Sequence, residues 1–127
     1  RREGILKVSF AGPAANLFLC FLAALLMALT NRLGLMSDGM YRFLLWMQLY
    51  NVWFAFFNLI PIPPLDGSRI LSELLPAKQS WPFNNIVDRY GFFILIALVF
   101  TGITGMIINP LANGYLMLVN SLLRIVF

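Results

Sequence analysis

The chain has 127 residues, of which 61% are hydrophobic and only 11% are charged, with a mean hydropathy of +0.84. These values are far from those of an ordinary soluble domain and indicate an integral membrane protein. Because a membrane span needs about 20 apolar residues, the charge-free stretches predict an all-α bundle of three to four transmembrane helices in one domain, residues 1–127. The net charge of +4 comes from basic residues scattered between apolar runs, which indicates topology signals and argues against a nucleic-acid partner.

Two residue types that often carry chemistry are scarce. Cys20 is the only cysteine, which excludes an internal disulfide, and its place in an apolar helix predicts a packed side chain rather than a reactive thiol. The chain has no histidine. It also starts at Arg1 rather than at a methionine, so we expect it to be the downstream part of a longer polypeptide.

The first expected span, residues 8–31, follows a short basic lead. Its opening, residues 10–16 (FAGPAAN), concentrates small side chains that let another helix approach closely, with Pro13 suited to the first helical turn. Asn16 then needs a partner, and a polar group on a neighbouring helix is the simplest one. Residues 32–42 are rich in turn-forming side chains and predict an exposed loop.

The second expected span, residues 43–60, is rich in aromatic side chains, which favour the headgroup level of a membrane near the span ends. A short helix follows it, and then the polar residues 78–89 predict an interfacial loop. The last charge-free run is too long to cross a bilayer as one helix. We therefore expect a break at Pro110 and its asparagine and glycine neighbours, which leaves spans at residues 90–108 and 111–127.

The residues between the second span and the short helix, 58–67 (NLIPIPPLDG), form the most informative stretch. Asp66 closes a membrane-length apolar segment, where a carboxylate is costly and marks a candidate functional site. Pro61, Pro63 and Pro64 lack backbone N–H donors and predict a proline-rich extended break. Hydrocarbon tolerates such backbone only where protein covers it, so Asp66 is expected to face protein.

Chemistry alone leaves several roles open for Asp66. Asp66 and Ser68 could cap the N-terminus of the short helix, which would make the carboxylate purely structural. Alternatively, a lone intramembrane carboxylate can serve proton relay, cation binding or metal ligation. Glu73 is most simply a solvent-side residue of the same short helix.

The basic residues predict the orientation of the chain. With the N-terminus in the cytoplasm, Arg32 and Arg42 lie outside and all other basic residues lie inside. Those inside are Arg1, Arg2, Lys7, Arg69, Lys78, Arg89 and Arg124. Asp66 is then expected toward the cytoplasmic side of the membrane.

Residues 57–67, preceded one span earlier by residues 11–16 (AGPAAN), closely resemble the site-2 protease family of intramembrane zinc metalloproteases. Both signatures occur in the family's order and spacing, each at the expected end of an apolar segment, and the compact prokaryotic branch is the most similar. The resemblance covers essentially the whole chain. It implies a multi-pass protein of a prokaryotic cell membrane that hydrolyses peptide bonds of membrane-embedded substrates near the cytoplasmic face.

The resemblance also implies roles for single residues. Asp66 matches the third protein ligand of the catalytic zinc, held by the turn that Gly67 permits. Asn58 takes the position of the motif asparagine, which would contact the substrate or the developing oxyanion. Pro61 and Pro63 would form an extended wall of the substrate cleft.

This sequence departs from the family in one respect, because without histidine it holds no HExxH motif. In the family, the two histidines of that helix are zinc ligands and its glutamate is the general base, and the helix lies upstream of residues 12–16. We therefore expect this chain to be inactive alone and to have three partners: the lipid bilayer, a membrane-protein substrate and the upstream HExxH-bearing segment of the same polypeptide.

Two other functions fit parts of the sequence. A non-catalytic membrane-binding module with the same fold would explain the missing histidines directly. A small transporter or proton relay that uses Asp66 is the weakest alternative, because transporters usually contain internal repeats and the proline-rich stretch has no second copy.

Overall fold

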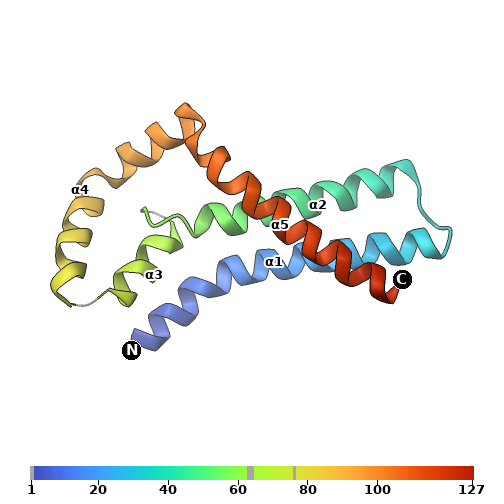
Figure 1. Cartoon of the computed structure of the whole chain (residues 1–127), viewed down its shortest axis with the longest axis horizontal. Coiled ribbons are helices and arrows are strands. Elements are labelled where there is room, and N and C mark those ends of the chain that lie inside the picture. The colour runs from blue at the N-terminus through green and yellow to red at the C-terminus, as the bar shows by residue number, and fades with distance from the viewer. Residues whose placement is uncertain (1, 63–64, 76) are drawn as a thin grey trace.

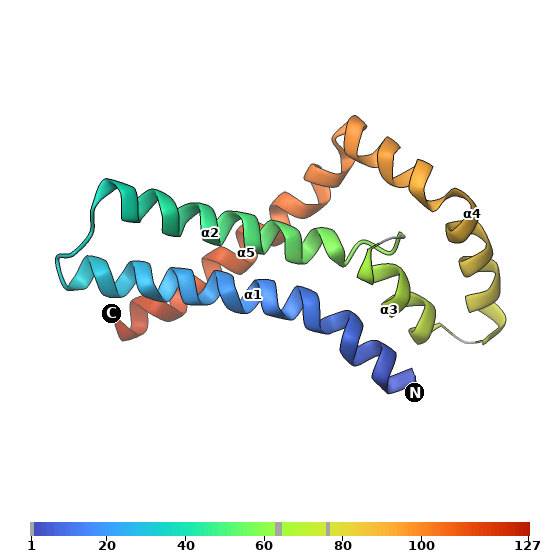
Figure 2. The ribbon, with the colours of Figure 1, turned by 180° about the vertical axis from the view of Figure 1, so that it is seen from behind.

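The computed structural model describes residues 2–62, 65–75 and 77–127. Within these ranges the chain forms five helices and no strand, which confirms the all-α class. The helices are α1 (Arg2–Arg32), α2 (Asp38–Asn58), α3 (Asp66–Leu74), α4 (Ala77–Thr101) and α5 (Ile103–Val126) (Figure 1). α1 and α2 lie antiparallel and side by side, and α5 crosses both of them (Figures 1 and 2).

Local signals shape the connection between α1 and α2. Gly34 takes the left-handed conformation, with φ of 72°, and the Leu35 N–H donates a hydrogen bond to the Thr30 carbonyl oxygen at 2.9 Å. This is the usual glycine-dependent end of a helix. Ser37 then caps α2, since its hydroxyl oxygen accepts a hydrogen bond from the Met40 N–H at 3.2 Å. The predicted loop is confirmed for residues 33–37, whereas residues 38–42, which it also included, belong to α2.

Small side chains hold α1, α2 and α5 together. Cys20 of α1, Val52 of α2 and Ala112 of α5 form a buried cluster, in which small residues allow close helix approach. The prediction of a packed Cys20 side chain is confirmed. Beside this cluster, the Tyr115 hydroxyl donates a hydrogen bond to the Leu17 carbonyl oxygen at 2.7 Å and joins α5 to α1. A second buried cluster consists of Ala24, Val119 and Leu123.

The predicted break at Pro110 is wrong, because Pro110 lies inside α5. The chain turns instead at Gly102, which has φ of 81° and separates α4 from α5. Glycine reaches the left-handed region without steric cost, whereas a proline in an apolar helix removes only one backbone donor. The expected spans at 90–108 and 111–127 are therefore replaced by α4 and α5, which divide eight residues earlier than Pro110.

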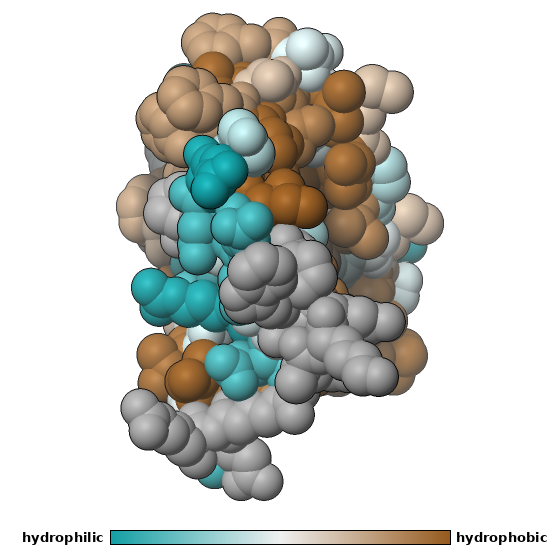
Figure 3. All heavy atoms as spheres, turned by 90° about the vertical axis from the view of Figure 1, so that its left-hand side faces the viewer, coloured by the Kyte–Doolittle hydropathy of each residue, from teal (hydrophilic) through white to brown (hydrophobic). Residues whose placement is uncertain are grey.

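The predicted polar loop at residues 78–89 is also wrong, because α4 begins at Ala77 and runs through it. Asn85, Asp88 and Arg89 are placed on this helix, so polarity here marks a helical surface rather than a loop. Figure 3 shows hydrophilic side chains gathered at the end of the molecule that carries α3 and α4. α4 contacts α3 and α5.

Two of the described helices, Gly4–Arg32 and Ile103–Val126, are long and apolar enough to cross a membrane. The first corresponds to the expected span at residues 8–31. The second corresponds to the expected span at residues 111–127 but begins eight residues earlier. This finding agrees with a membrane protein. Membrane crossing by α2 and α4, and with it the total of three to four spans, stays a prediction.

The predicted position of Arg124 is wrong. The Arg32 Nη1 atom donates a hydrogen bond to the Phe127 carbonyl oxygen at 3.3 Å, and Arg32 and Arg124 line the same cavity. Arg124 therefore lies at the end where α1 meets α2, with Arg32, and opposite the N-terminus (Figure 1). The reason is the path of α4, which turns into α5 on the side of α3, so that α5 runs back toward Arg32.

Candidate functional site

The connection from α2 to α3 is short and tightly folded. The Ile60 N–H donates to the Phe57 carbonyl oxygen at 3.1 Å, and the Ile62 N–H donates to the Ile60 carbonyl oxygen at 2.8 Å. The Leu65 N–H then donates to the Ile62 carbonyl oxygen at 3.0 Å. Pro63 and Pro64 lie outside the described residues, so the extended form of the proline stretch stays a prediction.

Gly67 fixes how α3 sits on the end of α2. It is the second residue of α3 and is buried. A Cβ atom at this position would overlap the carbonyl oxygens of Leu59 and Ile60. The expected turn at Gly67 is therefore corrected: the residue is helical, and it must be glycine because the backbone of the preceding connection passes directly against it.

Asp66 is the first residue of α3, and its carboxylate does not cap the helix. The capping residue is Leu65, and no side chain makes a capping hydrogen bond there. Ser68, the other expected cap, instead donates its hydroxyl hydrogen to the Leu65 carbonyl oxygen at 2.9 Å. The alternative that Asp66 and Ser68 are simple caps is therefore wrong. A carboxylate in the first turn still gains from the helix dipole.

The two sequence motifs meet at the Asp66 carboxylate. A Cβ atom at Gly12 would lie only 3.2 Å from Asp66 Oδ2, so the carboxylate occupies the space that this glycine leaves open on α1. Pro13, the next motif residue, is buried. Figure 1 shows α3 beside the N-terminal half of α1, and the two helices are in contact. The motifs lie on separate helices, and they meet at this contact.

Asp66 is half-buried, whereas Gly12 beside it is exposed. Across the described part of the chain, no hydrogen bond or ion pair joins the Asp66 carboxylate to another residue. Burying a carboxylate without a partner is costly, so an incoming cation or donor would be favoured here.

The structure describes only some of the other predicted site residues. Asn58 is the last residue of α2 and half-buried, and Pro61 is exposed in the connection that follows. Pro63 lies outside the described residues. The arrangement brings together Asp66, Gly67 and the end of α2, but it does not test the roles of Asn58 and Pro61.

Two features of the site were not found from the sequence. The contact between Gly12 and Asp66 depends on how α1 meets α3, which no local pattern encodes. Ser9, one helical turn before Gly12, is 1% exposed, and its hydroxyl lacks a hydrogen-bond partner in the described structure.

Asn16 makes no hydrogen bond to a described residue, so its expected helix partner stays a prediction.

A zinc ion fits Asp66 as one of its ligands. A carboxylate oxygen is an ordinary zinc ligand, and here the Asp66 side chain is half-buried and lies against Gly12. Among the residues whose placement is described, no three histidine, cysteine, aspartate or glutamate side chains come together. Zinc sites in proteins use three or four ligands, so Asp66 can supply only part of one.

Comparison with known proteins decides the family. Residues 30–101, which include the Asp66 motif, match the model of peptidase family M50. The chain belongs to this family, the site-2 proteases. It is 36% identical over 120 residues to the Bacillus subtilis (strain 168) protein named "Putative zinc metalloprotease YwhC", which covers 90% of this chain and 53% of that protein.

A second relative is more distant. The chain is 27% identical over 106 residues to "Zinc metalloprotease MJ0392" of Methanocaldococcus jannaschii, covering 83% of this chain and 30% of that protein. The site-2 protease chain thus spans about half the length of the first relative and less than a third of the second. No solved structure matches it.

Proposed function

We propose that this chain is part of an intramembrane zinc metalloprotease that hydrolyses peptide bonds of membrane-embedded substrates near the cytoplasmic face. The observation that carries the proposal is the Asp66 carboxylate, which lies against Gly12 of the other motif and makes no hydrogen bond within the described structure. Membership of the site-2 protease family supports the same conclusion.

Each motif residue has a distinct task in this proposal. Asp66 would supply one ligand to the zinc, and Gly12 leaves the space that this carboxylate occupies. Gly67 lets α3 rest against the end of α2, which fixes where Asp66 stands. Asn58, at the end of α2, would donate a hydrogen bond to the substrate or to the oxyanion that develops during attack.

The remaining parts of the active site would come from elsewhere in the same polypeptide and from the substrate. Two histidines and a glutamate of an HExxH segment would complete the ligand set and provide the general base. When bound, zinc acts as a Lewis acid that activates water for attack on a peptide carbonyl. Pro61 and Pro63 would hold one wall of the cleft in an extended form against the substrate.

The proposed setting is a prokaryotic cell membrane, with the N-terminus of this segment in the cytoplasm. The basic lead of α1 and Arg69 of α3 support this orientation, because both belong to the Asp66 end of the molecule. Arg124 no longer adds to this bias, since it lies at the opposite end.

The test is the variant Asp66→Asn in the full-length polypeptide. The amide side chain would keep the size of the carboxylate but lose its charge, so we expect zinc content to fall and cleavage of a membrane-embedded reporter to stop. Asp38→Asn is the matched control, because Asp38 is also the first residue of a helix and is exposed. Zinc content is measured by mass spectrometry on the purified protein.

Each outcome bears on the proposal. Loss of zinc and of cleavage in Asp66→Asn, with both retained in Asp38→Asn, supports it. Undiminished cleavage in Asp66→Asn would refute the ligand role. A parent protein that binds no zinc and cleaves nothing, yet is folded, would identify the non-catalytic membrane-binding module instead.

A further inference from the structure

Ser9 is buried in a stretch of α1 that is otherwise open. Its side chain is 1% exposed, whereas residues 4–8 and 10–12 are exposed or half-buried, including the apolar Val8 and Phe10. In a helix that crosses a membrane, apolar side chains can face lipid, but polar side chains face the protein interior. Ser9 is thus a polar group that lies on the protein side of α1.

The Ser9 hydroxyl makes no hydrogen bond in the described structure. Thr30, also on α1, shows the usual alternative, since its hydroxyl donates to the Leu26 carbonyl oxygen, one helical turn earlier, at 2.8 Å. Ser9 does not make such a bond to its own helix, so its donor stays free. A buried hydroxyl without a partner is unfavourable, and each one in a folded protein requires an explanation.

An acceptor without a partner lies on the same face of α1. Ser9 and Gly12 are three residues apart, so their Cβ positions are about 5–6 Å from each other along this face. Asp66 Oδ2 lies 3.2 Å from the Cβ position of Gly12 and accepts no hydrogen bond from a described residue. Ser68, next to Asp66 but one, already donates its hydroxyl hydrogen to the Leu65 carbonyl oxygen at 2.9 Å. The free donor beside this carboxylate is therefore Ser9.

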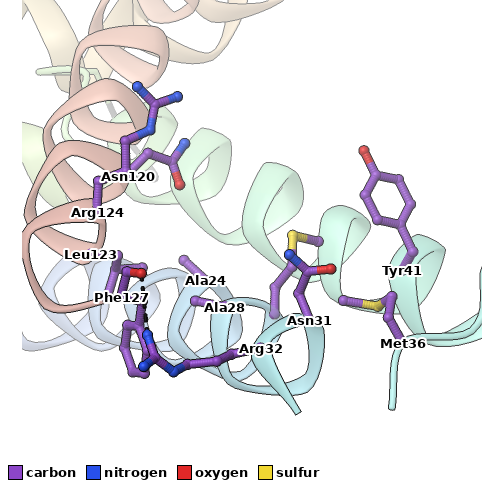
Figure 4. A pocket seen from close by; sticks show the side chains of 11 residues that line it. Ala24, Ala28, Asn31, Arg32, Met36, Tyr41, Asn120, Leu123, Arg124 and Phe127 are labelled. Carbon is purple, nitrogen blue, oxygen red and sulfur yellow. Dashed lines mark hydrogen bonds between the residues drawn. The ribbon is translucent and has the colours of Figure 1, made fainter. Parts of the chain in front are cut away.

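The cavity at the other end of α1 presents a different case. It has a volume of about 480 Å³ and lies between the ends of α1 and α5 and the connection into α2 (Figure 4). The guanidinium groups of Arg32 and Arg124 point away from each other there, and Arg32 donates to the Phe127 carbonyl oxygen at 3.3 Å. At the Asp66 end, by contrast, a free donor and a free acceptor share one helix face.

We propose that Ser9 is a positioning residue for the zinc ligand Asp66. Its hydroxyl donates a hydrogen bond to Oδ2, the carboxylate oxygen on the side of α1, and leaves the other oxygen to the metal ion. This inference rests on the proposed function and deepens it. A group that hydrogen-bonds a ligating carboxylate fixes the orientation of that ligand, and its loss typically weakens metal binding about 10–100-fold.

The test is the zinc affinity of the full-length polypeptide, measured by competition with a chelator of known strength. Ser9→Ala removes the donor and should lower the affinity about tenfold. Thr104→Val is the matched control, because Thr104 on α5 also carries a buried hydroxyl without a partner in the described structure. It should bind zinc as the unaltered protein does. Ser9→Thr, which keeps a hydroxyl at position 9, should retain most of the affinity.

Stability separates a positioning role from a structural one. Removing a hydroxyl that has no partner relieves the cost of burying it, so the midpoint of SDS-induced unfolding should stay the same or rise in Ser9→Ala and in Thr104→Val. If Ser9 served only packing, Ser9→Ala would lower that midpoint and the zinc affinity together. A loss of zinc affinity without a loss of stability is therefore the result that the proposed hydrogen bond predicts.

Three results would overturn the inference: equal zinc affinity of Ser9→Ala and Thr104→Val, a loss of stability that parallels the loss of zinc, or an equal loss of zinc in Ser9→Ala and a folded Ser9→Thr. If circular dichroism shows that Ser9→Thr is unfolded, the comparison of Ser9→Ala with Thr104→Val decides.

The variant Asp66→Asn distinguishes this inference from the proposed function. If Asp66→Asn loses zinc while Ser9→Ala keeps it, Asp66 is a ligand and only the role of Ser9 fails. If the unaltered full-length protein binds no zinc, the proposed function fails and the role of Ser9 fails with it.

Discussion

Both α2 and α3 begin with the pair Asp-Gly, and the two pairs occupy the same helical positions in different surroundings. Asp38 and Gly39 follow a serine cap and are exposed, and a Cβ atom at Gly39 would meet nothing within 4 Å. Asp66 and Gly67 follow Leu65, which stands at the capping position but makes no capping hydrogen bond with its side chain. Their neighbours are Gly12 on α1 and the backbone that ends α2.

This difference separates a structural helix start from a candidate functional one. At α2, local groups satisfy the helix: Ser37 caps it and Asp38 complements its dipole. At α3, the backbone approaches too closely for any side chain at Gly67, and the Asp66 carboxylate finds no hydrogen-bond partner in the part of the chain described. Natural proteins tend to depart from the usual patterns of helix capping and polar pairing at their functional sites.

The largest effect expected from this comparison is on stability. Gly67→Ala would force a methyl group into the carbonyl oxygens of Leu59 and Ile60. Backbone atoms cannot move away as a flexible side chain can, so we expect a loss of about 3 kcal/mol in the free energy of unfolding, the upper end of the usual cost of overpacking. The measurement is SDS-induced unfolding in detergent micelles, followed by circular dichroism.

Gly39→Ala is the matched control for this variant, because the same change occurs at the same helical position with open space around it. It should leave stability unchanged or raise it slightly, since alanine is a better helix former than glycine. Equal stability of the two variants would mean that α3 does not rest against the end of α2.

The same comparison explains what the sequence could predict. The connection between α1 and α2 follows from signals carried by adjacent residues, Gly34 and Ser37. Asp66 was found as a candidate because a carboxylate after a long apolar run and a proline-rich stretch is unusual at any helix start. The all-α class followed from composition.

What the sequence could not predict depends on contacts between distant segments. The close contacts at positions 12 and 67 each involve a second segment: Asp66 lies against Gly12, and the backbone after α2 lies against Gly67. They are therefore invisible in either segment alone. The turn at Gly102 was missed because Pro110 carries the stronger local signal, yet a helix tolerates it. Arg124 was misplaced because its position follows from the path of α4.

A smaller effect is expected at the other wall of the site. Gly12→Ala would bring a Cβ atom to 3.2 Å from Asp66 Oδ2, so the carboxylate must shift by a few tenths of an ångström. Stability should change by less than about 1 kcal/mol, because the helix gains from alanine what the contact loses. Zinc affinity of the full-length protein should fall about tenfold, as it does when groups around a metal ligand are altered.

Gly4→Ala, on the same helix with nothing within 4 Å of the added atom, controls for the helix-forming effect of alanine. Zinc affinity is obtained by competition with a chelator of known strength. If Gly12→Ala and Gly4→Ala hold zinc equally well, the space beside Asp66 does not matter for the metal, and Gly12 serves only close helix contact.

The smallest effect belongs to the structural helix start. Ser37→Ala removes the hydroxyl oxygen that accepts the hydrogen bond from the Met40 N–H, so the free energy of unfolding should fall by about 1 kcal/mol.

Ser121→Ala is the control, because it is the same change at an exposed position within α5. Its free energy of unfolding should stay within about 0.5 kcal/mol of that of the unaltered protein. Zinc content should stay the same in both variants, because Ser37 precedes α2, whose start lies at the end of the bundle opposite α3 (Figure 1). A fall in zinc content in Ser37→Ala would mean that the two helix starts are coupled through α2, and that the separation between a structural and a functional Asp-Gly pair does not hold.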